Sequence, residues 1–159
     1  MTHHDINAEA PTGAFVVSGA DVVAEARSWM AVKWRHQGRS REGVDCAGLV
    51  IKVAHELGLT EFDTADYSRQ ATDETMLELC REHLVEIVHA AAEPGDVAVM
   101  RFGANRHIGF FGDYPHGGLT LIHAYSSPPR RVVEHRFNDD WLRMNRAQLI
   151  GIFRFPGIA

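Results

Sequence analysis

The most constraining feature of the sequence is a change of character near residue 93, which divides helix-like segments from strand-like ones. Before the turn sequence "AAEPGD" apolar residues recur at helical spacing. After it, short runs rich in β-branched and aromatic residues are separated by turn signals. The strand-like runs are "VAVMRF", "RHIGFFG", "LTLIHAY", "RRVVEHRF" and "QLIGIFRF". Helices followed by strands are typical of an α+β fold, because βαβ units would alternate along the chain. We therefore predict N-terminal helices packed on a C-terminal antiparallel β-sheet.

Three helices are predicted before this change. The first starts at Ser18, where Asp21 three residues later gives a capping-box-like pattern, and it continues to about Val32. The second lies in the stretch "GVDCAGLVIKVAHELG" (43–58), in which apolar residues recur at helical spacing and which Gly58 is suited to end. Cys46 falls in the first turn of this second helix.

The third helix is predicted in "ATDETMLELCREHL", with a cap near Thr72. Its inward face contains Met76, Leu77 and Cys80, so Cys80 is most simply a core residue. The chain has two cysteines, and neither sits in a C-x-x-C pair, so both are interpreted as free thiols.

Size and composition indicate one domain. The 159 residues, 45% apolar and 23% charged, are enough to bury a hydrophobic core. We predict a flexible N-terminal segment over residues 1–17, in which His3 and His4 are surface residues, and a single domain over residues 18–159. The formal charge of −5, from 16 basic and 21 acidic residues, gives no basic field for nucleic acid. Nucleic acid is therefore not an expected partner.

The sequence also gives no sign of a membrane segment. No window approaches the roughly 18 consecutive apolar residues that a membrane span needs. The N-terminal sequence "MTHHDINAEAPTG" lacks the basic start and apolar core of a signal peptide. We expect synthesis in the cytoplasm without a signal peptide, and no membrane span.

Cys46 is a candidate nucleophile because of its place at a helix start. The thiolate attacks carbonyls, and a helix N-terminus with a nearby histidine lowers a thiol pKa from about 8.5 to roughly 3.5–7.5. The amides of the first helical turn can also hold an acyl oxyanion. The alternative is that Cys46 is a small residue filling a core. A nucleophile would need a base from elsewhere in the chain.

His107 and His123 lie on consecutive predicted strands joined by a loop that contains "DYPHGG". Facing positions in an antiparallel hairpin have a constant index sum, and a turn centred near Pro115 gives a sum of about 230, which pairs the two histidines. His123 would then orient His107 and fix its tautomer. With Cys46 they would form the thiol, base and orienting group of a cysteine acyl-transfer site. The alternative is that both are half-buried structural histidines.

Four segments together resemble the NlpC-type cysteine peptidases of bacterial cell walls, and within them the phage-associated branch. They are "WRHQGRSREGVDCAGLV" (34–50), "EPGDVAVMRFG" (93–103), "RHIGFF" (106–111) and "LIHAY" (121–125). The tail "RRVVEHRFNDDWLRMNRAQLIGIFRFP" is also similar to that branch, so the resemblance spans roughly residues 20–156. It implies a papain-like α+β catalytic domain.

The resemblance also implies an activity. Cys46 would be the nucleophile, His107 the general base and His123 the orienting residue. Family members hydrolyse peptidoglycan stem peptides, often between D-glutamate and a diamino acid. A stem peptide is therefore the expected partner, and neither a cofactor nor a metal is expected.

Substrate-binding positions follow from the same resemblance. Asp45 matches a family aspartate that helps to bind substrate. Trp34 stands where many members have tyrosine, and Ala47 stands where many have serine, so two hydroxyls associated with gripping the amino end of the substrate are absent. The resemblance therefore does not imply whether this chain shares the family's usual preference for a free N-terminal L-alanine. His36, ten residues before Cys46, is a further candidate for lining the cleft.

Two other functions stay open from the residues alone. Cys46, His107 and His123 are one sulfur and two nitrogens, a ligand set of some catalytic zinc sites, which would make the chain a zinc hydrolase. The chain would otherwise be a non-catalytic tail module that binds cell wall. Members of the phage branch act within tail or prophage-derived particles, which implies phage-tail or particle proteins as partners and action at the cell wall as part of a phage-like particle.

Overall fold

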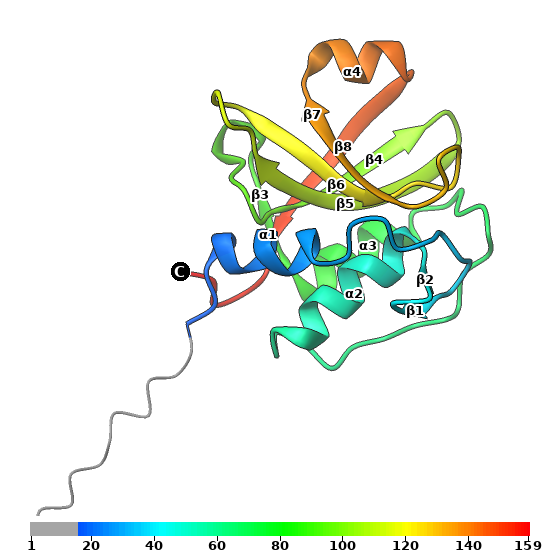
Figure 1. Cartoon of the computed structure of the whole chain (residues 1–159), viewed down its shortest axis with the longest axis horizontal. Helices are drawn as coiled ribbons and strands as arrows, with labels where there is room; N and C mark the ends of the chain where they lie inside the picture. Colours follow the sequence, from blue (N-terminus) through cyan, green and yellow to red (C-terminus); the bar gives the residue numbers. More distant parts are fainter. Residues whose placement is uncertain (1–15) are drawn as a thin grey trace, which may run out of the picture.

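The fold is built on a six-stranded antiparallel sheet with three helices on one side and a fourth on the other (Figure 1). The computed structural model describes residues 16–159, so His3, His4 and all but the last two residues of segment 1–17 lie outside the described residues. The helices are α1 (Gly19–Arg27), α2 (Cys46–Glu56), α3 (Thr75–His83) and α4 (Asp139–Met144), with a 3₁₀ turn η1 (His89–Ala91). The main sheet contains β3 (Val85–Ile87), β4 (Val97–Phe102), β5 (Asn105–Asp113), β6 (Leu119–Ala124), β7 (Val132–Phe137) and β8 (Ala147–Arg154), in the order β3-β8-β4-β5-β6-β7.

The predicted α+β architecture is confirmed. Three helices precede the strands of the main sheet along the chain, and every neighbouring strand pair in that sheet is antiparallel. A separate two-stranded hairpin, β1 (Arg39–Ser40) and β2 (Gly43–Val44), leads into α2.

The sheet is apolar on both faces. Because side chains alternate along a strand, Val97 and Val99 of β4 pack toward α1 and α2, whereas Ala98 and Met100 pack on the opposite face. That opposite face is covered by Trp141 of α4.

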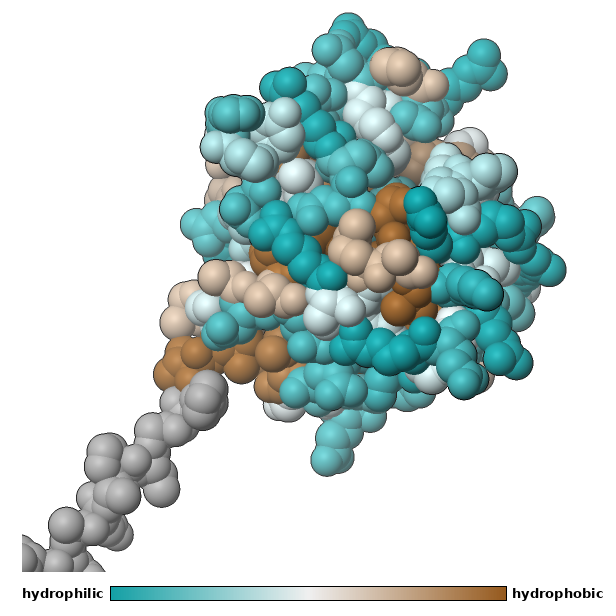
Figure 2. Space-filling view, viewed as in Figure 1, coloured by the Kyte–Doolittle hydropathy of each residue, from teal (hydrophilic) through white to brown (hydrophobic). Residues whose placement is uncertain are grey.

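The visible surface is mostly hydrophilic (Figure 2). The large apolar side chains exposed among the described residues are Val16, Met30, Val85, Val88 and Met144.

The first helix begins as predicted and ends early. Ser18 and Asp21 form both hydrogen bonds of a capping box. The helix ends at Arg27 instead of near Val32, because residues 28–31 form turns that finish with Ala31 in the left-handed region (φ 67°).

The third helix was predicted to start too early. No side chain caps it near Thr72, and it begins at Thr75. Upstream, the amide of Arg106 donates to the carbonyl of Ala71 (2.7 Å), which holds this part of the chain against β5. Cys80 is buried in the core, as predicted.

The register predicted for the β5–β6 hairpin is wrong, because the index sum of the paired residues differs from the predicted sum by two. The observed pairs Phe110↔Ile122 and Phe111↔Leu121 have an index sum of 232, not 230. The connection is centred one residue later than predicted, with Gly117 and Gly118 both at positive φ. His123 therefore lies opposite Gly109 and diagonal to His107.

Two elements of the main fold, β3 and α4, were not predicted from the sequence. β3 is three residues at the sheet edge, mostly exposed, and α4 is six residues without a buried side chain. Neither has enough apolar periodicity to stand out in the sequence.

Within residues 16–159, no helix is long and apolar enough to cross a membrane.

Candidate active site

Cys46 is the first residue of α2, and its place is fixed by the residue before it. The Asp45 side chain caps the helix by accepting a hydrogen bond from the Gly48 amide (2.7 Å). Leu49 and Val53 fill the core beneath α2 and are fully buried, whereas Cys46 keeps some exposure. Core packing of α2 is therefore supplied by residues one and two turns beyond the thiol.

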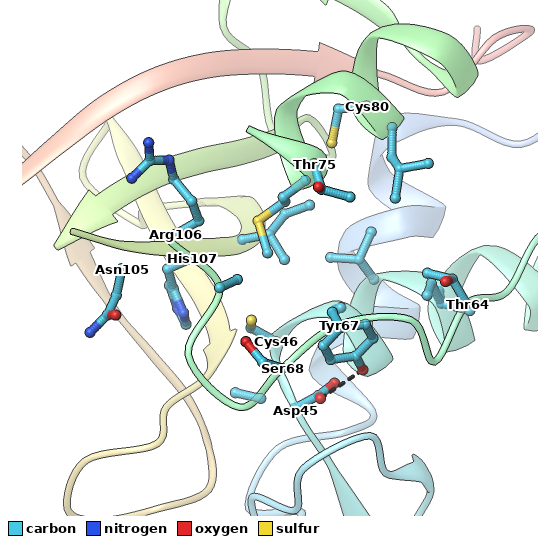
Figure 3. Close-up of a pocket in the computed structure, with 18 of the residues that line it drawn as sticks. Asp45, Cys46, Thr64, Tyr67, Ser68, Thr75, Cys80, Asn105, Arg106 and His107 are labelled. Atoms are coloured by element: carbon cyan, nitrogen blue, oxygen red, sulfur yellow. Dashed lines mark hydrogen bonds between the residues drawn. The ribbon is translucent and has the colours of Figure 1, made fainter. Parts of the chain in front are cut away.

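Cys46 opens into a cleft with a cavity volume of about 570 Å³. The cleft lies between the start of α2, the start of β5, α3 and residues 60–74, a segment without helix or strand that we call the strap. Cys46 and His107 both project into this cleft (Figure 3). The three predicted substrate-binding residues, Trp34, His36 and Asp45, also line it. Its volume is in the range of pockets that bind small-molecule ligands.

His107 and His123 are in direct contact although the predicted register was wrong. The Nε2 atom of His107 and the Nδ1 atom of His123 are 2.6 Å apart. Gly109 permits this diagonal contact, because a Cβ atom there would lie 2.9 Å from the Cβ atom of His123 and 2.8 Å from the carbonyl oxygen of Ile122. His107 is 9% exposed and His123 is 1% exposed, so the pair is shielded from water.

Burial sets the protonation of the thiol and the imidazoles. Burial, with a smaller effect of the Asp45 carboxylate, raises the pKa of the Cys46 thiol to about 12, against the lowering effect of nearby amides. Burial lowers the pKa of His107 to about 4, with a further contribution from His135, and it lowers the pKa of His123 in the same way. The resting site at neutral pH therefore holds a neutral thiol and a neutral imidazole.

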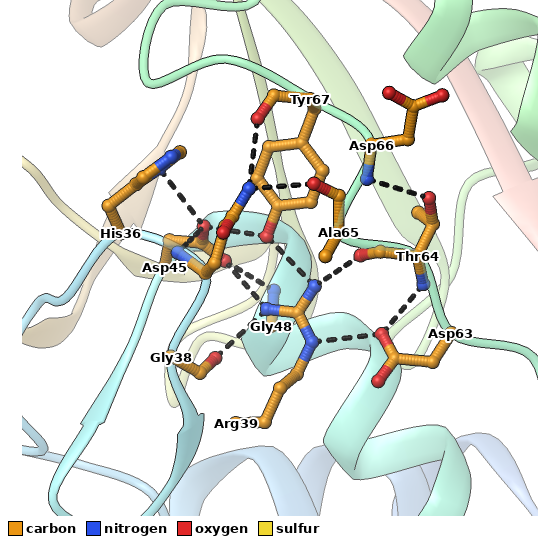
Figure 4. A network of polar contacts seen from close by, with 11 residues as sticks. His36, Gly38, Arg39, Asp45, Gly48, Asp63, Thr64, Ala65, Asp66 and Tyr67 are labelled. Carbon is orange, nitrogen blue, oxygen red and sulfur yellow. Dashed lines mark hydrogen bonds and ion pairs between the residues drawn. The ribbon is translucent and has the colours of Figure 1, made fainter.

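Asp45 is the centre of a polar network at the rim of the cleft (Figure 4). Besides the Gly48 amide, its carboxylate accepts hydrogen bonds from the Gln37 amide (2.7 Å) and the Tyr67 hydroxyl (2.7 Å), and it pairs with Arg39 (3.2 Å). Each carboxylate oxygen thus has two protein donors. A substrate ammonium group could reach this carboxylate only by displacing one of them.

Arg39 fastens the strap to this network. Its guanidinium donates to Asp63 (3.0 Å), to the carbonyl of Thr64 (2.8 Å) and to the hydroxyl of Tyr67 (2.8 Å). Burial and the Asp45 carboxylate raise the pKa of Tyr67, so its hydroxyl stays protonated and donates to Asp45. Tyr67 was missed by the sequence analysis, since it lies 21 residues after Cys46 in a segment without a motif. It supplies a phenolic hydroxyl that Trp34 cannot.

His36 and Trp34 occupy the same rim. Nδ1 of His36 is 3.9 Å from the Asp45 carboxylate, and its ring meets the Tyr67 ring edge-on at 5.7 Å. The guanidinium of Arg69, in the strap, lies 5.0 Å from the centre of the Trp34 ring. Both side chains therefore line the cleft and contact residues of the strap.

His135 is the other residue that the sequence analysis left without a role. It lies on β7, and its Nε2 atom is 2.8 Å from Nε2 of His123. Both ring nitrogens of His123 are therefore engaged with other imidazoles.

Within residues 16–159, no three His, Cys, Asp or Glu side chains are arranged to hold a metal ion. This geometry does not favour a zinc site made of Cys46, His107 and His123.

The arrangement of helices on an antiparallel sheet, with a cysteine at a helix start beside the sheet, places the chain among papain-like α+β domains. A family model described as "NlpC/P60 family" matches residues 31–144, and the chain belongs to this family. No relative was found among curated proteins.

Solved structures agree with the fold. The NlpC/p60 domain of peptidoglycan hydrolase SagA is 19% identical with a TM-score of 0.54, over 86% of this chain and 98% of that one. NlpC2 from Trichomonas vaginalis is 19% identical with a TM-score of 0.62, over 87% of this chain and 47% of that one. The peptidoglycan hydrolase RipB from Mycobacterium tuberculosis is 17% identical with a TM-score of 0.54, over 86% of this chain and 64% of that one. At such identities the likeness concerns the fold alone.

Proposed function

We propose that this chain is a cysteine endopeptidase that hydrolyses peptidoglycan stem peptides between D-glutamate and the following diamino acid. The observation that carries the proposal is that one cleft contains both a thiol at a helix start and a histidine. The Nε2 atom of that histidine, His107, is hydrogen-bonded to a second histidine, His123. Membership of the NlpC/P60 family supports the substrate class, as do the names of SagA and RipB as peptidoglycan hydrolases.

Cys46, His107 and His123 act in the proposed reaction as nucleophile, general base and orienting residue. The sulfur attacks the carbonyl carbon of the scissile amide while His107 takes the thiol proton. Free amides of the first turn of α2 stabilise the oxyanion of the tetrahedral intermediate. His107 then protonates the leaving amine, the carbon–nitrogen bond breaks, and a thioester remains. Water, deprotonated by His107, hydrolyses the thioester and restores the thiol.

Trp34, His36 and Asp45 form the substrate side of the proposed site. Trp34 and His36 contact the stem peptide directly, and Asp45 shapes the cleft through α2 and Tyr67. Since four protein donors already occupy the Asp45 carboxylate, a free amino group on the substrate is not required. The chain therefore accepts stem peptides whose L-alanine is still joined to the glycan.

Mass spectrometry of the products of peptidoglycan digestion tests this function. Two substrates are compared: purified peptidoglycan with glycan-linked stems, and free stem peptides with an exposed L-alanine. The expected products of both are fragments that begin with the diamino acid. Binding to peptidoglycan without any fragment would mean a non-catalytic module, and activity lost with a chelator but resistant to iodoacetamide would mean a zinc hydrolase. Cleavage of the free peptides alone would overturn the part of the proposal that concerns Asp45.

We propose in addition that the enzyme works as part of a phage-tail or prophage-derived particle. The support is the resemblance of residues 34–50, 93–103, 106–111, 121–125 and the tail to phage-associated peptidases. Particles purified from the producing cells after prophage induction are expected to contain this chain by protein mass spectrometry. Its presence only in particle-free fractions would contradict the association.

A further inference from the structure

Three histidines form a line from the cleft toward the surface. They come from the neighbouring strands β5, β6 and β7. His107 Nε2 lies 2.6 Å from His123 Nδ1, and His123 Nε2 lies 2.8 Å from His135 Nε2. The line ends at the backbone, where His135 Nδ1 is 3.0 Å from the carbonyl oxygen of Arg136.

The carbonyl at the end of the line determines which nitrogens carry protons. A carbonyl oxygen only accepts hydrogen bonds, so Nδ1 of His135 carries a proton. In a neutral His135, Nε2 is then an acceptor, and Nε2 of His123 donates to it. The Nδ1 atom of His123 is left as an acceptor, and Nε2 of His107 donates to that. The unprotonated nitrogen of His107 is consequently Nδ1.

The hydrogen bonds of the three histidines also leave Nδ1 of His107 available to act as a base. Of the six nitrogens in the three rings, it is the one without a hydrogen-bond partner within residues 16–159. His107 lines the cleft that holds Cys46, whereas His123 and His135 do not line it. A lone pair on Nδ1 is what a base needs in order to take the thiol proton.

Aromatic neighbours hold the rings in this order. Trp141 of α4 stacks on His135, with the ring centres 4.7 Å apart and an angle of 27° between the planes. Phe102 meets His107 edge-on at 5.4 Å. His123 is 1% exposed between them, so it has no water to replace a lost partner. The helix α4, which had no predicted role, thus supports the outer end of the line.

We propose that His135 is a positioning residue of the active site, which fixes the tautomer of His107 through His123 and so keeps the Nδ1 lone pair of His107 available. The proposal rests on the proposed function for the meaning of that lone pair. Without an acceptor at position 135, His123 is free to place its proton on Nδ1 and donate to His107. His107 would then carry its proton on Nδ1 and could not accept one from Cys46.

The test uses His135→Phe, which keeps a ring on Trp141 and removes the acceptor, and His135→Glu, which restores an acceptor. The tautomer of His107 is read from ring-nitrogen chemical shifts in two-bond proton–nitrogen correlation spectra of the labelled full chain. Wild type and His135→Glu are expected to carry the His107 proton on Nε2, and His135→Phe is expected to show a substantial Nδ1-protonated fraction. His116→Phe, at an exposed histidine of the β5–β6 loop, is the control and should match wild type.

Two rates complete the test. The rate of Cys46 labelling by iodoacetamide at neutral pH and kcat on stem peptides should each fall about 10- to 100-fold in His135→Phe, as when a group that orients a functional histidine is removed, with KM little changed. His135→Glu should recover most of both rates. The spectra and the labelling need no peptidase substrate, so they judge the inference even if the proposed function fails. Wild-type His107 protonated on Nδ1, or unchanged spectra and labelling in His135→Phe, would overturn it.

Discussion

Replacing Cys46 by alanine is expected to lower the rate of stem-peptide cleavage by about 10⁴-fold or more, the loss seen when a covalent nucleophile is removed. The thiol at the start of α2 is the group that would form the thioester, and a methyl group cannot replace it. Stability should change little, because Leu49 and Val53 carry the packing of α2. The rate is measured by mass spectrometry of released fragments, and the fold by thermal unfolding.

The matched control is the other cysteine. Cys80→Ala removes a thiol from the core cluster and should retain cleavage, while the stability decreases by about 1 kcal/mol through the loss of buried volume. Iodoacetamide should inactivate wild type and Cys80→Ala alike. Undiminished cleavage by Cys46→Ala would refute a covalent mechanism.

Replacing His107 by alanine should lower kcat about a thousandfold, within the range for loss of a general base. KM should change less, since in the proposed mechanism His107 acts on the thiol and the leaving amine more than on the bound peptide. His116→Ala provides a histidine control outside the cleft. A His107→Ala enzyme with a kcat within a few-fold of wild type would mean that another group takes the proton.

The acid limb of the pH profile follows from the environment of His107. Burial, and to a smaller extent His135, lowers its pKa to about 4, so the neutral base form persists well below the ordinary histidine value of about 6.5. The wild-type kcat/KM is therefore expected to stay high down to about pH 5 and to fall toward pH 4. A midpoint near 6.5 would contradict the burial of the base.

The lowered pKa of His107 also makes the stability of the fold depend on pH, and this effect must be separated from the effect on activity. A buried histidine with a lowered pKa binds fewer protons in the folded chain than in the unfolded chain between about pH 4 and 6.5. The free energy of unfolding consequently rises with pH across that window and falls on acidification. Circular dichroism at each pH identifies the range in which the activity values refer to folded enzyme.

The sequence was most informative where local chemistry decides the structure. The start of α2 could be predicted because apolar spacing begins directly after Asp45, and the strands could be predicted because their residues alternate between two apolar faces. The register could not, because two glycines at positive φ shift the turn by an amount that no residue pattern specifies. The contact between His107 and His123 nevertheless forms, because it requires neighbouring strands and a diagonal reach that long side chains have.

The parts of the site that the sequence analysis missed depend on tertiary contacts. Tyr67 is one polar residue in an irregular strap, and only the fold brings it to Asp45. His135 has no motif that indicates a role, and its contact with His123 depends on the pairing of β6 with β7 and on the small helix that carries Trp141. Neither residue has a local motif around it.

Gly109 has no functional group, but the proposed active site restricts which residue can stand there. It faces His123 across the hairpin, and any side chain there would collide with that histidine and with the backbone beside it. In a deep mutational scan selected for wall cleavage, position 109 would therefore be as intolerant as a catalytic position. That intolerance would reflect the space that His107 and His123 need, and not a chemical role of Gly109. Such a scan therefore distinguishes reacting residues from residues that only leave space for them when the structure is considered with it.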